Sequence, residues 1–443
     1  MVKRFLVSKI TSQKFELNYR ISILFLVVLF LILFIVPTIG PYEGAQIEIK
    51  SFQKLSNWWD LSSPLIPYFL NINSKFDWIL FYSFLIFLIL KSFIKSFIIE
   101  NLNKKQFFGF LSLFYLSSIF SIIGGRDGIA FALIIYALSN LYKLDRNSNY
   151  ILKIVMNYFI LFIAANYKIA LVPLIGFGLF VIHQTHDNLF NTSFKFILFV
   201  FVAPVLIFGV RNELTKILEI RNAYPEQQVM FYDLASAYCW TYDPEVRKFS
   251  SKALENFTNT GYINEKFCSN LKPYGWDSLH SPSDSSVETN ILVQKIEYDD
   301  NIKFTKLKSH WLNYIVHYPK SYVEIRSNFF GQILSMNNAF TRGEPLLDLT
   351  TNSLAQLIRS LVLLPAKILD NFFITTYFFA ITFLTLSVFF LKKCILPYLI
   401  LFLGLVASLF SFVADNGRYV ISYLLLFWIM LLANQINNKS KVK

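Results

Sequence analysis

The stretch ISILFLVVLFLILFIVPTIG, residues 21–40, is an apolar run that ends directly at the acidic segment PYEGAQIEIK, residues 41–50. As a helix, the run is long enough to cross roughly 30 Å of hydrocarbon. It lacks the small-residue cleavage site that ends a signal peptide, so we expect a retained membrane helix. An acidic group is thereby predicted at the mouth of the first membrane segment.

The composition extends this pattern to the whole chain. Of the 443 residues, 55% are apolar, 18% are aromatic and only 16% are charged. A soluble domain of this size is far less apolar, so the composition predicts a polytopic membrane protein. The net charge of +13 is expected to lie on cytoplasmic loops. We therefore predict a lipid bilayer as the environment and no nucleic-acid partner.

Further apolar runs alternate with basic and weakly charged loops. The first basic cluster precedes the first run and consists of Lys3, Arg4, Lys9, Lys14 and Arg20. By the positive-inside rule it places the N-terminus in the cytoplasm. The later runs are residues 77–90, 107–123, 129–141, 151–165, 169–182, 196–210, 371–391, 395–413 and 419–432. The sequence thus predicts an all-α protein with about ten transmembrane helices and both termini inside.

The runs divide the chain into three parts. Residues 1–210 form a membrane module with a first outer loop at 41–76, and residues 353–443 form a second module that starts with an amphipathic segment. Between them, residues 211–352 are polar and punctuated by prolines, with short helical stretches at 245–257 and 301–317. We expect this part to be an ordered outer cap.

The first outer loop has helical periodicity. Apolar residues recur at Ala45, Ile49 and Phe52, and Trp58 and Trp59 follow. This pattern is typical of a helix lying in the membrane interface, and residues 64–70 form a second apolar stretch. Such elements would wall a cleft with Glu43 at its edge. Two interpretations of Glu43 stay open: a reacting group, or a solvated carboxylate at a helix end.

Three isolated cations lie at outer helix ends. Arg126, Lys168 and Arg418 are each flanked by apolar sequence, and the predicted topology brings all three to the same face. Arg126 could pair with Asp127, and Arg418 with Asp415, but Lys168 has no acidic neighbour in sequence. Basic groups at membrane depth need an anionic partner. A shared phosphate or pyrophosphate on a lipid fits all three.

Two of the three cysteines, Cys239 and Cys268, fall in the cap, and Cys394 lies in a predicted helix. An oxidising exterior would permit a bridge that contributes about 3 kcal/mol by loop entropy. Two buried thiols are the other interpretation, and the sequence leaves both open. No metal site is predicted: His183 and His186 are interpreted as solvated loop residues.

The order of short motifs resembles the GT-C glycosyltransferases, in particular the protein mannosyltransferase and lipid A aminoarabinose transferase branch. The motifs are an acid after the first helix at 41–46, a Trp/Pro-rich continuation at 58–67 and an Arg opening a helix at 125–130. An Asn-Tyr-Lys end at 164–168 and an Arg-Tyr pair at 418–419 complete the set.

The resemblance implies a GT-C-like seven-helix core and transfer of a sugar from a polyprenyl-phosphate donor at the outer face. Glu43 would be the catalytic base, and Arg126, Lys168 and Arg418 would bind the donor phosphate. The candidate sugar or acceptor contacts are Tyr42, Glu48, Asp60, Asp127 and Asp415. The acceptor would be lipid-, glycan- or protein-linked, in cell-envelope glycan or glycolipid synthesis at a bacterial cytoplasmic membrane. No cofactor is predicted, and a divalent metal stays open.

Two other function classes share parts of this pattern. A polymerase of O-antigen or exopolysaccharide type also uses polyprenyl-linked sugars and outer arginines, and residues 126–138 suit it equally well. A transporter or flippase usually places ionisable residues at mid-membrane and often has inverted repeats. The apolar runs here carry few charges at their centres and no repeat is visible, which disfavours the transporter.

Overall fold

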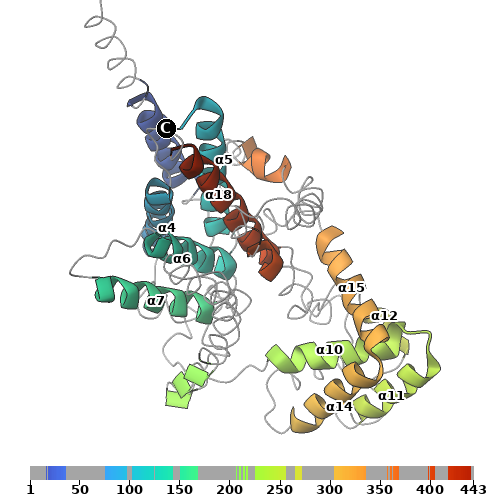
Figure 1. The fold of residues 1–443 in the computed structure, drawn as a ribbon. Helices are drawn as coiled ribbons and strands as arrows, with labels where there is room; N and C mark the ends of the chain where they lie inside the picture. The colour runs from blue at the N-terminus through green and yellow to red at the C-terminus, as the bar shows by residue number, and fades with distance from the viewer. Residues whose placement is uncertain are drawn as a thin grey trace, which may run out of the picture.

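The computed structural model is helical over the part of the chain that it describes, and no strand occurs in that part (Figure 1). The described residues are 16, 18–35, 75–96, 102–123, 125–142, 150–167, 206, 209–210, 213–214, 216–217, 225–255, 265–271, 304–335, 357, 360–361, 363–368, 398, 400–404 and 418–440. The predicted all-α class is confirmed at this level.

One group of helices corresponds to the predicted apolar runs. It contains α4 (Lys75–Ser96), α5 (Lys104–Ile123), α6 (Gly125–Tyr142), α7 (Tyr150–Tyr167) and α18 (Arg418–Ser440). α6 packs against α4, α5, α7 and α18, and α5 packs against α4 and α18 (Figure 1). We call these five helices the bundle. A further helical segment covers residues 18–35 and ends in the π-helical turn η1 (Leu31–Ile35).

Local chemistry explains how the bundle helices start and pack. At the start of α5, the Asn103 side chain accepts a hydrogen bond from the Gln106 N–H at 2.9 Å, and the Gln106 side chain accepts one from the Asn103 N–H at 3.1 Å. This reciprocal cap satisfies two backbone donors that the first helical turn leaves unpaired. Phe93 of α4 then packs its ring edge-on against Phe110 and Phe114 of α5, with centroids 5.4 and 5.7 Å apart.

Within the described ranges, two helices are long and apolar enough to cross a membrane, judged by length and composition: Ile79–Ser96 in α4 and Lys104–Ile122 in α5. Shorter apolar helices are Asn18–Leu33, Asp127–Leu141, Ile151–Ala165 and Ile421–Ala433. These helices suggest an association with membranes. The predicted helices at 169–182 and 371–391 lie outside the described residues, as do the interfacial helices predicted in the first outer loop. The predicted helices at 196–210 and 395–413 are described only in part.

A second group of helices lies within residues 211–352, and we call its members the cap helices. They are α10 (Pro225–Trp240), α11 (Pro244–Glu255), α12 (Glu265–Asn270), α14 (Phe304–His317) and α15 (Pro319–Ser335). α10 is central and contacts each of the other four (Figure 1). Three of the cap helices begin with proline, whose missing N–H costs nothing in a first turn.

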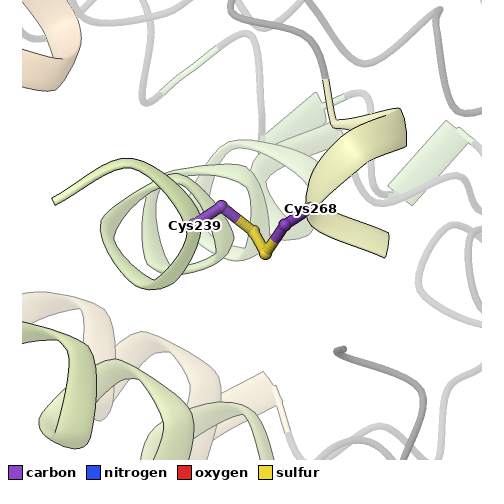
Figure 2. Close-up of a disulfide and its surroundings, with 2 residues drawn as sticks. All are labelled: Cys239 and Cys268. Atoms are coloured by element: carbon purple, nitrogen blue, oxygen red, sulfur yellow. A yellow bond between two sulfur atoms is a disulfide. The ribbon is translucent and has the colours of Figure 1, made fainter. Parts of the chain in front are cut away.

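The cap helices α10 and α12 are joined covalently. Cys239 and Cys268 form a disulfide with an S–S distance of 2.03 Å and a Cα–Cα distance of 5.2 Å (Figure 2). Of the two interpretations that the sequence leaves open, the structure has the bridge. The bridge closes a loop with a sequence separation of 29, which contains all of α11.

Candidate functional site

One end of the bundle is defined by the junction of α5 and α6. A single residue, Gly124, separates the end of α5 from the start of α6. At Gly128, an added Cβ would lie 2.3 Å from the Phe120 carbonyl oxygen and 2.9 Å from the Ser121 Cα. Only glycine permits this approach, so α6 starts against the backbone of the last turns of α5. Asp127 is buried in the first turn of α6, where a negative charge is favoured by the helix dipole.

The start of α18 lies at the same end. Figure 1 shows α5 and α18 running in opposite directions, and Leu432 is the neighbour that a Cβ on Gly109 would meet, at 3.6 Å. Arg418 lies 14 residues before Leu432 (432 − 418), and Ile123 lies 14 residues after Gly109 (123 − 109). From this contact, equal numbers of residues at about 1.5 Å each lead to the start of α18 and to the end of α5, so both lie toward the same end of the bundle.

The end of α7 approaches this level as well. α6 and α7 pack in opposite directions (Figure 1), and Asn140 of α6 donates a hydrogen bond to Asn157 of α7 at 3.2 Å. From that pair, α6 extends back 15 residues to Gly125 (140 − 125), and α7 extends forward 10 residues to Tyr167 (167 − 157). Measured along the helices, the end of α7 therefore stops about five residues, or roughly 8 Å, short of the start of α6.

The opposite end of the bundle holds basic side chains of α4. Lys95 donates a hydrogen bond to Asn140 of α6 at 2.9 Å, and Lys91 lies over the Tyr136 ring at 5.5 Å. These lysines lie near the end of α6, while Gly125 begins it, so they are separated along α6 from the glycine-rich junction. The bundle thus has one end with Lys91 and Lys95 and another where α4, α6 and α18 begin.

Two predicted site residues lie at the end of the bundle where α6 and α18 begin. Arg126 is the second residue of α6, and Arg418 is the first residue of α18; their side chains lie outside the described residues. Helix N-termini carry partial positive charge and free N–H donors, and both favour an anion. The arrangement can hold a phosphate between two helix starts. Glu43, Tyr42, Glu48, Asp60, Lys168 and Asp415 lie outside the described residues.

A second polar cluster, which the sequence did not predict, is buried among the cap helices. Asp233 of α10 accepts hydrogen bonds at 2.8 Å from Arg326 of α15 and at 2.8 Å from the indole N–H of Trp311 of α14, both on Oδ2. Asp233 and Arg326 are 0% and 1% exposed, so the pair is closed to solvent. It joins α10 to α14 and α15, two consecutive helices that lie far from α10 in sequence.

Burial sets the electrostatics of this cluster. Desolvation raises the pKa of Asp233, although the charge of Arg326 and the hydrogen bonds from Trp311 and Arg326 oppose it. Burial lowers the pKa of Arg326, but the Asp233 carboxylate together with Tyr322 and Tyr232 outweighs burial, and the pKa is raised. Burial also raises the pKa of Tyr314, whose hydroxyl lies 3.1 Å from the Ser321 hydroxyl. Because Asp233 and Arg326 are closed to solvent and neutralise each other, we assign the cluster to folding.

A faint signal for the cluster exists in the sequence. Arg326 interrupts an apolar helical spacing between Tyr322 and Phe329, and its guanidinium lies 6.0 Å from the centroid of each of these rings. Asp233 is the only charged residue in the stretch 227–240. A charge at a core position needs a partner, but nothing in the sequence says that these two residues meet.

Among the described residues, no three His, Cys, Asp or Glu side chains gather as metal ligands would. No protein family, no curated protein and no solved structure matches this chain.

Proposed function

We propose that this chain is a polytopic membrane glycosyltransferase that takes a sugar from a polyprenyl-phosphate-linked donor at the outer face of a bacterial cytoplasmic membrane. The observation that carries the proposal is the common end of α6, α7 and α18. Arg126 and Arg418 lie in the first turns of two of these helices, and Lys168 follows α7 directly in sequence. Three cations and two helix N-termini suit the phosphate of a lipid-linked donor.

Two features of the structure support the orientation. The end of the bundle that holds Lys91 and Lys95 is expected in the cytoplasm by the positive-inside rule, which leaves the common end of α6, α7 and α18 outside. The Cys239–Cys268 disulfide fits a cap in an oxidising compartment, on the outer face. Both termini are then cytoplasmic.

The proposed chemistry is a single displacement. The acceptor hydroxyl gives its proton to Glu43 as its oxygen attacks C1 of the donor sugar. The bond from C1 to the phosphate oxygen breaks, and its electron pair leaves with the polyprenyl phosphate. The cations of Arg126, Lys168 and Arg418 stabilise that developing charge. Tyr42, Glu48, Asp60, Asp127 and Asp415 remain candidate contacts to the sugar or to a lipid-, glycan- or protein-linked acceptor.

Glu43→Gln tests the base. Because glutamine cannot accept the proton, turnover is expected to fall roughly 10²- to 10⁴-fold while donor binding stays nearly unchanged. The assay measures transfer from polyprenyl-phosphate sugar and donor affinity for the full-length protein in nanodiscs. Glu213→Gln is the matched control, since Glu213 forms an exposed pair with Lys216 at 2.7 Å. Normal turnover by Glu43→Gln would contradict the assignment.

A polysaccharide polymerase is the second candidate, and the charge at the common helix end favours it. A polyprenyl monophosphate sugar is a phosphodiester with a single negative charge, whereas a pyrophosphate linkage carries more charge and spans a longer distance. The three cations Arg126, Lys168 and Arg418 together with the starts of α6 and α18 match the larger anion better. In this case the acceptor hydroxyl belongs to another lipid-linked repeat unit.

The choice of donor separates the two candidates. The transferase is expected to bind polyprenyl-phosphate sugar and release polyprenyl phosphate; the polymerase is expected to bind pyrophosphate-linked repeat units and release polyprenyl pyrophosphate. Isothermal titration calorimetry with each donor measures which donor binds, and mass spectrometry of the released lipid identifies the product. In both cases Arg126→Gln and Arg418→Gln should weaken donor binding, so unchanged binding in both variants would refute the phosphate site itself.

A further inference from the structure

The short helix α12 is attached to α10 by buried apolar side chains and by a disulfide. It is six residues long, and isolated helices of that length do not persist in water. Its apolar contacts include Phe267, whose ring meets Phe231 of α10 edge-on at 6.4 Å, and Leu271 lies buried directly after the helix. Both side chains are buried. The disulfide from Cys268 to Cys239 is the covalent part of the attachment (Figure 2).

The other cap helices are held by contacts that do not pass through α12. Asp233 joins α10 to α14 and α15 through Trp311 and Arg326. α11 buries Val246, Ser250, Ala253 and Leu254, and its Phe249 ring lies 5.5 Å from Tyr318. Loss of α12 would therefore leave the packing among α10, α11, α14 and α15 intact.

We propose that the Cys239–Cys268 bridge is a redox latch: its reduction releases α12 from α10 while the other cap helices stay packed. In the reduction, an external dithiol gives two electrons and two protons to the bridge and becomes a disulfide, and Cys239 and Cys268 become thiols. Closing the latch is the reverse exchange with an extracytoplasmic disulfide donor. Both cysteines are only partly buried, so the bridge does not lie in the closed core of the cap helices.

Alkylation of the full-length protein in native membranes tests whether the latch is closed. The chain has three cysteines, Cys239, Cys268 and Cys394. After denaturation without reductant, a maleimide is expected to add one label, at Cys394, and after reduction it is expected to add three. Three labels without reductant would mean that the bridge does not form in the mature protein, and would overturn the proposal.

Limited trypsin digestion tests what the latch holds. Reduction, or Cys268→Ser, is expected to speed cleavage at Lys266 in α12 roughly 100-fold, because a loop of about 30 residues is no longer closed. Cleavage at Lys306 and Lys308 in α14 is expected to stay slow. Cys394→Ser is the matched control and should behave as the unmodified chain does.

The digestion pattern also separates the latch from the alternatives. If Lys306 and Lys308 are cleaved together with Lys266, the bridge holds the whole cap and the selective latch is refuted. If cleavage at Lys266 does not accelerate, α12 is held by its apolar contacts and the latch is again refuted.

Discussion

Replacing Arg326 with leucine is expected to destabilise the cap helices by about 3–5 kcal/mol, because the change leaves the Asp233 carboxylate buried without its counter-charge. Arg326 donates to Asp233 at 2.8 Å, and both side chains are closed to solvent. Hydrogen exchange of the full-length protein measures the effect as faster exchange of amides in α10, α14 and α15. If the free energies of protection of these amides in the variant lie within about 1 kcal/mol of those in the unmodified chain, the prediction is wrong.

Two further variants identify the cause. Arg247→Leu is the matched control: Arg247 is exposed on α11, with its guanidinium 5.6 Å from the Tyr238 ring, so its loss should cost less than about 1 kcal/mol. The double variant Asp233→Leu with Arg326→Leu removes both charges. It should recover much of the lost stability, since apolar replacements of a buried pair are often tolerated.

Gly128→Ala is expected to displace the start of α6 from the end of α5 and to cost about 1–3 kcal/mol. The new Cβ would lie 2.3 Å from the Phe120 carbonyl oxygen, and backbone atoms cannot move aside as a flexible side chain can. Thermal unfolding in detergent measures the stability. Because Arg126 lies two residues earlier, the affinity for a polyprenyl-linked donor should fall in the same variant.

Gly109→Ala is the matched control in the same bundle. Its Cβ would meet Leu432 at 3.6 Å, an ordinary contact, and alanine is the better helix former by up to about 1 kcal/mol. Stability should therefore stay the same or rise. If Gly128→Ala behaves as Gly109→Ala does, the close approach of α5 and α6 does not determine the position of the α6 start.

The bundle helices could be predicted because apolar length alone defines them. The predicted runs 107–123 and 151–165 differ from α5 and α7 by three residues or fewer at each end. The additional turns of α18 at residues 433–440 are polar, and a search for apolar length stops before them. That α6 starts against the last turns of α5 depends on Gly128, and nothing in the local sequence indicates the backbone atoms that it contacts.

The cap was harder to predict because its helices are not marked by apolar length. Helical segments were expected at 245–257 and 301–317, near α11 and α14, but α10 and α15 were not expected. The sequence pattern indicates breaks between elements at Pro225 and Pro319, whereas the structure has these prolines as the first residues of α10 and α15. Asp233 in α10 and Arg326 in α15 also interrupt the apolar pattern of their helices. Only the tertiary structure shows that these two charges neutralise each other.

The Asp233–Arg326 pair also has a consequence for the time course of synthesis. Trp311 and Arg326 follow Asp233 by 78 and 93 residues, so a ribosome adding roughly 5–20 residues per second completes Arg326 about 5–20 s after Asp233. During that interval α10 emerges with an unpaired carboxylate on the face that it later buries. Water must solvate this face until α14 and α15 arrive, which makes the nascent cap a substrate for chaperones and proteases.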